Sequence, residues 1–342
     1  MVWLRVRRWV VRPIFWAFAI LALVALGLRA FLASDFVAGR LARLTERELS
    51  RVAGRPVRIG GLEFELLPTS VVLHDLLVPS DSPGDPPFLT IRRLLVELDS
   101  DALSRDLVDV QTVYASGVRG HLVLREDGGD NLPRFPAGET GSSPLAVRIG
   151  GLYVEDAELD LGDRRVPLDV RARAVLVRLA GLGGTELQGT VTAQEVETLL
   201  PGARPWPATV SGKIRLEGDR VEILHARVAS AELDARVSGT IGWKGGTHGE
   251  LRGTVEASAA WLDERGYLDG EIVGDLRFDG KLRFARRELR LEGTLASPAL
   301  ALFGVRVDDL EGALTGDRER LELAIEHGDY RSGALDGSFA VD

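Results

Sequence analysis

Apolar and charged residues alternate with a period of two over most of the chain after Pro56. The clearest alternation runs from Leu276 to Leu295, where Arg, Lys, Asp and Glu separate the apolar residues. A period of two places successive side chains on opposite faces of a strand, so each strand should have one apolar and one charged face. Glycines and acid-glycine pairs between the runs are typical of hairpin turns. The pattern predicts a mainly β fold of roughly 18 strands.

Helical periodicity is limited to short segments. Ser34 or Asp35 can cap a helix with apolar residues near one face, and Gly54 ends it. We therefore expect an amphipathic stem helix over residues 34–55. Two further short helices are expected, at 194–200 and at 257–264.

An apolar stretch precedes the stem. Residues 14–28 contain no charged side chain, and with Arg29 tolerated near its far end the stretch reaches Ala33. About 20 helical residues span about 30 Å, the thickness of the hydrocarbon core of a bilayer. We therefore expect a transmembrane signal-anchor helix over residues 13–33, with 14–33 in the membrane. A cleaved signal peptide is the alternative, which the length of the stretch and the lack of a clean small-x-small cleavage site disfavour.

The charge distribution gives this segment a direction. Residues 1–12 form a basic tail with four arginines and no acid, whereas the whole chain has a formal net charge of −9. Positive charge stays on the cytoplasmic side of a membrane, so the N-terminus should be cytoplasmic and everything from Ser34 onward exported. The acidic body would be repelled by phosphate backbones, and no nucleic-acid partner is expected.

Composition and motifs disfavour an enzyme. The chain has no cysteine, which removes disulfides, thiolate metal sites and cysteine nucleophiles. Its five histidines stand far apart, and no Walker loop, nucleophile elbow or dinucleotide fingerprint is present. We expect no catalytic residue, no metal and no cofactor. Asp127, Asp130 and Asn131 lie close together, but they lack the later glutamate of a calcium loop, which favours a plain hairpin turn.

One internal repeat is visible. Residues 57–62, Val-Arg-Ile-Gly-Gly-Leu, recur letter for letter at 147–152. Six consecutive identities favour a duplication or a shared structural role over coincidence. A Pro/Gly/Ser stretch at 136–144 separates the copies and predicts a boundary between modules 56–137 and 145–342, although it could equally be one long loop.

The order of parts resembles the AsmA-like and TamB-like proteins of Gram-negative envelopes. After the anchor at 14–33, residues 49–60 look like the family's helix, Gly-Arg turn and first strand, with Gly54 and Arg55 at the turn. The likeness continues through 66–68 and 73–78. It ends at 125–132, which resembles the family's Arg-x-x-Asp-Gly-x-Asn-Leu turn with one inserted residue. Over 145–342 the likeness is one of alternation only.

The resemblance implies a long, curved, mostly antiparallel sheet that forms an open groove, in a protein anchored in the bacterial inner membrane with its bulk in the periplasm. In that family the apolar inner face is associated with phospholipid acyl chains moving between the two membranes, and TamB-like members with assembly of outer-membrane and autotransported proteins. The residues alone leave two folds open, because a sheet with one apolar face can close as a sandwich or barrel or curl around a ligand. The resemblance favours the groove.

The expected function is passive phospholipid transport between inner and outer membranes; the alternative is a scaffold for assembly or translocation of outer-membrane or autotransported proteins. Expected partners are membrane phospholipids, the inner membrane and an outer-membrane β-barrel protein. At about 4.8 Å per strand, roughly 18 strands stack to about 90 Å, which is short for a periplasm, so the chain should be truncated at its C-terminus or need partners. The cleanest alternation supplies the candidates for the lipid-facing wall: Leu276, Phe278, Leu282, Phe284, Leu289, Leu291 and Leu295.

Overall fold

The computed structural model describes residues 43, 45–47, 49–51, 54–66, 69–82, 84–99, 107–127, 129–131, 146–164, 168–199, 205–243, 247–259, 272–285, 288–302, 305–317, 320–330 and 333–341. The predicted basic tail, the transmembrane helix at 13–33, the first part of the stem helix and the linker at 136–144 lie outside these residues. Among the described residues, no helical segment combines the length and the hydropathy needed to cross a bilayer.

Eighteen strands make up most of the described chain and belong to one sheet. They are β1 (Gly61–Leu66), β2 (Thr69–Val78), β3 (Leu89–Leu98), β4 (Leu107–Leu124), β5 (Ala146–Ile149), β6 (Gly151–Asp163), β7 (Leu168–Gly183), β8 (Glu186–Leu199), β9 (Trp206–Glu217), β10 (Arg220–Ala229), β11 (Leu233–Gly242), β12 (His248–Ser258), β13 (Ile272–Ala285), β14 (Glu288–Leu302), β15 (Val305–Gly316), β16 (Leu321–Tyr330), β17 (Gly333–Ala334) and β18 (Gly337–Val341). The predicted mainly β fold is confirmed.

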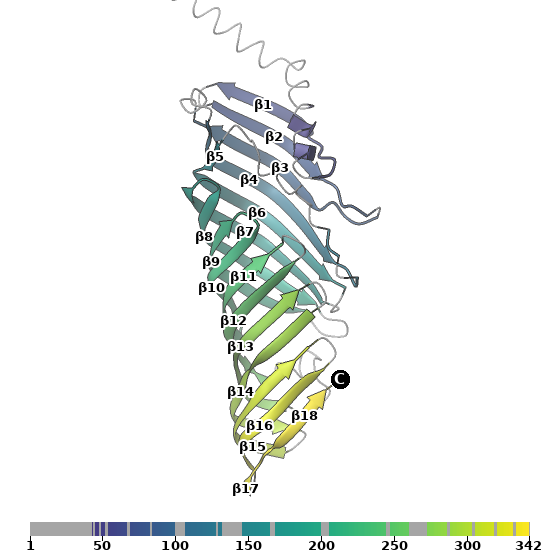
Figure 1. Ribbon diagram of the computed structural model, residues 1–342, viewed down its shortest axis with the longest axis vertical. Coiled ribbons are helices and arrows are strands. Elements are labelled where there is room, and N and C mark those ends of the chain that lie inside the picture. Colours follow the sequence, from purple (N-terminus) through teal and green to yellow (C-terminus); the bar gives the residue numbers. More distant parts are fainter. Residues whose placement is uncertain are drawn as a thin grey trace, which may run out of the picture.

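The sheet is built almost entirely from neighbours in sequence. The strands form two antiparallel series, β1 to β4 and β6 to β16. Within each series, every strand pairs antiparallel with the strand that follows it. The exceptions are β5 and β6, which both pair in parallel with β4, and β17 and β18, which both pair with β16. No pairing within the described ranges joins β1 to β18. The result is one long, curved, open sheet with β1 at one end and β18 at the other, as expected (Figure 1).

The predicted helix at 194–200 is wrong, because its described residues 194–199 end strand β8. Ala193 and Val196 are both buried on the same side of the sheet although they stand three residues apart. That spacing mimics a helical period, and its cause is a register shift between β8 and β9 at this point. The expected helix at 257–264 is displaced at its start, because Ala257 and Ser258 still belong to β12 and helical geometry begins at Ala259. Its remaining residues lie outside the described part of the chain.

One face of the sheet is apolar throughout. A single row of paired residues crosses the strands from β1 to β16, and every member is apolar or glycine. In order the row is Leu62, Leu73, Leu94, Ala115, Val154, Val177, Val191, Gly212, Ala226, Val237, Gly253, Gly280, Gly293, Leu314 and Leu323. The side of the sheet that carries this row is called the apolar face.

The opposite side, the charged face, is held by ion pairs between neighbouring strands. Its cross-strand pairs are Arg119–Glu158, Arg215–Glu222, Arg227–Asp234, Arg283–Glu250 and Lys281–Glu292. Hydrogen bonds from Arg283 and Arg252 hold the pKa of Glu250 below its ordinary value. Such exposed pairs add little stability each, but the charged side chains of β6 to β16 keep this part of the face in water.

The curvature has a local cause in bulge-like steps that recur on neighbouring strands. Leu73 and Leu76 of β2 are buried in one cluster although three residues apart, and Asp75 between them has φ of 49°. The same three-residue step occurs between Ala115 and Val118 of β4, where Gly117 has φ of 63°. Further left-handed residues stand at equivalent steps in β6, β7 and β15: Asp156, Ala174 and Asp309. Because such steps bend a strand and increase its twist, a line of them curls the sheet.

Among these left-handed residues Ala174 has the most strained backbone. Its Cβ is strained at φ of 50°, whereas Asp tolerates the left-handed region. Replacing Ala174 with glycine is expected to raise the free energy of unfolding by about 0.5–1 kcal/mol, measured by urea denaturation. The matched control is Ala180→Gly, an exposed position of the same strand outside the left-handed residues, which is expected to lose a similar amount. Equal effects of the two substitutions would contradict the strain argument.

The described part of the stem covers the first end of the apolar face. Residues 45–47 and 49–51 are helical, and Leu49 packs with the buried residues Leu73 and Leu76 of β2. Gly54, with φ of 65°, follows the helix, as expected from the sequence. The Oγ of Ser50 and the Oε1 of Glu46 accept hydrogen bonds from the backbone at Val57 and Ile59, both at 2.8 Å. The stem is therefore fixed to the start of the sheet.

The two copies of the repeat have the same local role. In each copy the second glycine begins a strand, Gly61 the six-residue β1 and Gly151 the 13-residue β6. The first glycine donates its N–H to a neighbouring strand, from Gly60 to His74 and from Gly150 to Val110. A Cβ on Gly150 would lie 2.6 Å from the carbonyl oxygen of Gln111, so only glycine fits there.

Candidate functional site

The structure places all seven lipid-wall candidates on the apolar face of two adjacent strands. Leu276, Phe278, Leu282 and Phe284 belong to β13, whereas Leu289, Leu291 and Leu295 belong to β14. Cross-strand pairs join Phe278 to Leu295, Leu282 to Leu291 and Phe284 to Leu289. All seven side chains are half-buried. Their common face is as the alternation predicts, and their contact with lipid stays a prediction.

Exposure shows that the apolar face is not covered like an ordinary core. Neither β10 nor β12 contains a fully buried residue, although both present apolar side chains on this face. Leu159, Val305 and Leu321 remain 45%, 43% and 42% exposed. In a sandwich the facing sheet would bury such positions. The main contacts of each described strand are instead with strands beside it in the sheet.

The middle of the sheet is better buried than its second half. Small side chains of β4 to β9 form one cluster there: Ala115, Val118, Ala157, Val175, Ala193, Val196 and Ala208. Leu179 of β7 and Leu187 of β8 are only 3% and 2% exposed. The candidates chosen from the sequence do not include this section of the apolar face, because each three-residue step interrupts its period-two pattern. Pairs of apolar residues three apart on successive strands are the signal that could have revealed it.

Two aromatic rings of the apolar face occupy the space left by glycines, which have no side chain. Gly253, Gly280 and Gly293 are in register across β12, β13 and β14. The Phe278 ring lies over this row, since a Cβ on Gly293 would come within 2.6 Å of its Cε2. Phe284 lies in the same way over Gly249, 2.6 Å from a Cβ placed there. Both rings therefore lie along the sheet instead of standing on it, which leaves a broad, shallow apolar surface.

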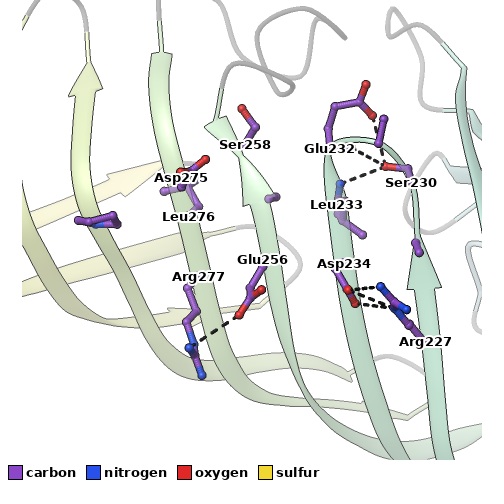
Figure 2. A pocket seen from close by; sticks show the side chains of 14 residues that line it. Arg227, Ser230, Glu232, Leu233, Asp234, Glu256, Ser258, Asp275, Leu276 and Arg277 are labelled. Atoms are coloured by element: carbon purple, nitrogen blue, oxygen red, sulfur yellow. Dashed lines mark hydrogen bonds and ion pairs between the residues drawn. The ribbon is translucent and has the colours of Figure 1, made fainter.

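A pocket of about 480 Å³ lies where β10 to β14 end, and Figure 2 shows it to be lined mainly by charged-face residues. The guanidinium of Arg227 lies 2.6 Å from a carboxylate oxygen of Asp234, and Arg277 lies 3.7 Å from Glu256. Hydrogen bonding to Arg227 lowers the pKa of Asp234. Ionised groups paired in this way do not suit an acyl chain. The pocket nevertheless adjoins the apolar face, because Leu276, one of the seven candidates, lines it together with its cross-strand neighbours Ala257 and Leu233.

The first and the last of the family-like segments, residues 49–60 and 125–132, are in contact. Arg55, from the Gly-Arg turn, donates from Nη1 to the carbonyl oxygen of Asn131 at 3.0 Å and lies 5.9 Å from the centre of the Phe88 ring. Asn131 is fully buried; its Oδ1 accepts from the N–H of Val123 at 2.9 Å and its Nδ2 donates to the carbonyl of His121 at 2.7 Å. These contacts tie the end of the stem to the turn after β4.

The acidic residues of that turn serve its backbone and its neighbours. Asp127 accepts a hydrogen bond from the N–H of Gly129 at 2.8 Å, as in a tight turn. Arg125 reaches to the β2–β3 connection and lies 2.7 Å from Asp81, whose pKa it lowers through that hydrogen bond. Within the described residues no group of His, Cys, Asp and Glu is arranged to hold a metal ion. The geometry is that of the hairpin turn that the sequence favours.

Comparisons with protein-family models, with curated proteins and with solved structures give no significant match, so the apolar face of the open sheet is what the function has to be inferred from.

Proposed function

We propose that this chain is an inner-membrane-anchored periplasmic protein whose sheet forms an apolar groove for passive phospholipid movement between the inner and outer membranes. The observation that carries the proposal is the unbroken apolar row from Leu62 to Leu323, on a face whose seven candidate side chains on β13 and β14 are only half-buried. Acyl chains would lie on this face while the headgroups stay in water. The resemblance of residues 14–135 to AsmA-like and TamB-like proteins supports the same function.

Continuity of the row matters because of the energetics of an acyl chain. Each methylene group left in water costs about 0.8 kcal/mol, so a polar gap of even one strand would be a barrier. The row has no polar side chain between its ends. On β12 to β14, charged side chains stand directly beside the row member in sequence and belong to the opposite face. A uniformly apolar surface binds any acyl chain weakly and without selecting a headgroup, which suits passive movement.

Site-specific photocrosslinking tests this function. A photoreactive phenylalanine analogue at Phe278, on the apolar face, is expected to form phospholipid adducts in cells, which mass spectrometry of the purified full-length chain would detect. The same analogue at Arg277, which directly precedes Phe278 but lies on the charged face, is the matched control and should give at least tenfold less adduct. Equal yields at the two positions, or adducts at neither, would reject the groove.

A further inference from the structure

A hydrogen bond joins two segments that are far apart along the sheet. The hydroxyl of Thr247 donates to Oδ2 of Asp130 at 3.3 Å, across 117 residues of sequence. Asp130 follows β4 and forms a bridge with Leu124, the last residue of that strand. Thr247 directly precedes β12. From β4 to β12 the sheet advances by seven strand steps, or roughly 34 Å at about 4.8 Å per step.

The two residues lie on opposite rims of the sheet, a rim being the side formed by successive strand ends. Leu124, the end of β4, pairs with Asp163, the end of β6, and Asp163 pairs with Leu168, the start of β7. From β7 onward each antiparallel pair places the start of one strand beside the end of the other. The same rim therefore continues to the end of β12 at Ser258. Thr247 adjoins the other end of β12. Its contact with Asp130 therefore connects one rim to the other.

A rim-to-rim contact crosses the opening of the groove. Burial along the spanned section is uneven: Leu179 and Leu187, on β7 and β8, are 3% and 2% exposed, whereas β10 contains no fully buried residue. On the flanking strands β13 and β14, the seven candidate side chains of the apolar face are half-buried. The rim-to-rim contact thus spans the section from β4 to β12, and the candidate strands β13 and β14 lie beyond it.

We propose that Asp130 and Thr247 form a gate that must open for a phospholipid to pass. The inference rests on the proposed function: if acyl chains lie in the groove and headgroups project from it into water, a bond across the opening blocks the headgroup. A single hydrogen bond between partly exposed side chains is weak enough to open and close readily.

The absence of native cysteine makes a direct test possible. In the full-length chain, Asp130→Cys and Thr247→Cys are combined and joined by a short, reducible bis-methanethiosulfonate crosslinker. Transfer of fluorescent phosphatidylethanolamine between phosphatidylethanolamine–phosphatidylglycerol vesicles is then measured before crosslinking, after it and after reduction. The matched control pair is Arg227→Cys with Arg236→Cys, which face each other on neighbouring strands and do not span the opening.

We expect the Asp130–Thr247 pair to crosslink within one molecule, to lose transfer at least tenfold, and to recover it on reduction, while the control pair keeps its transfer throughout. Failure to crosslink would overturn the contact itself. Crosslinking with unchanged transfer would overturn the gate, because headgroups would then be passing beneath the link. Failure of the proposed function is separate: it would appear as missing lipid adducts at Phe278 in the chain that carries no cysteine.

Discussion

Arginine in place of Leu282 is expected to stop phospholipid transfer while the sheet stays folded. Leu282 lies in the middle of β13, paired with Leu251 on one side and Leu291 on the other. A charge there would have to be passed by every acyl chain. At about 2.5–3.5 kcal/mol for an arginine in a hydrocarbon environment, transfer should fall by roughly 100-fold in the vesicle assay. The half-buried position lets the long side chain reach water, so folding is retained.

The control introduces the same side chain on the other face. Thr294 of β14 is exposed and pairs with Asp279 on the charged face. Thr294→Arg should leave transfer unchanged and keep the far-ultraviolet circular dichroism of the parent chain. If both arginines slow transfer equally, the apolar face is not the path that the lipid follows.

Replacing Asn131 with alanine is expected to cost about 2–6 kcal/mol of unfolding free energy. The substitution leaves the N–H of Val123 and the carbonyl of His121 without the side-chain partner that each has now, in a site where Asn131 is 0% exposed. An unsatisfied buried polar group costs about 1–3 kcal/mol, and two such groups are created. Urea denaturation followed by circular dichroism would measure the loss.

Asp127→Ala is the appropriate comparison for Asn131→Ala, because it removes a hydrogen bond from the same turn at an exposed position. Its expected cost is below about 1 kcal/mol. A similar small loss for both variants would show that Asn131 does not hold the turn together.

The features that sequence predicts well are those decided locally. Period-two alternation depends only on adjacent residues, which is why the common face of Phe278, Leu282 and Leu291 could be predicted. The helix expected at 194–200 failed because a register shift gives a strand the spacing of a helix. The parallel pairing of β4 with β6 and the contact of Asp130 with Thr247 depend on which distant segments meet, and alternation carries no information about that.

Because most strands bond to the strand that precedes them, the molecule resembles a one-dimensional chain of coupled units, whose stability is close to a sum of nearest-neighbour terms. Such a chain can acquire structure progressively from one end, with each new hairpin docking on the last. The parallel step is the exception, since β6 must wait for the long connection after β4 to double back. Folding should therefore pause at this step, and nascent chains stalled shortly before β6 should be the ones most sensitive to proteases.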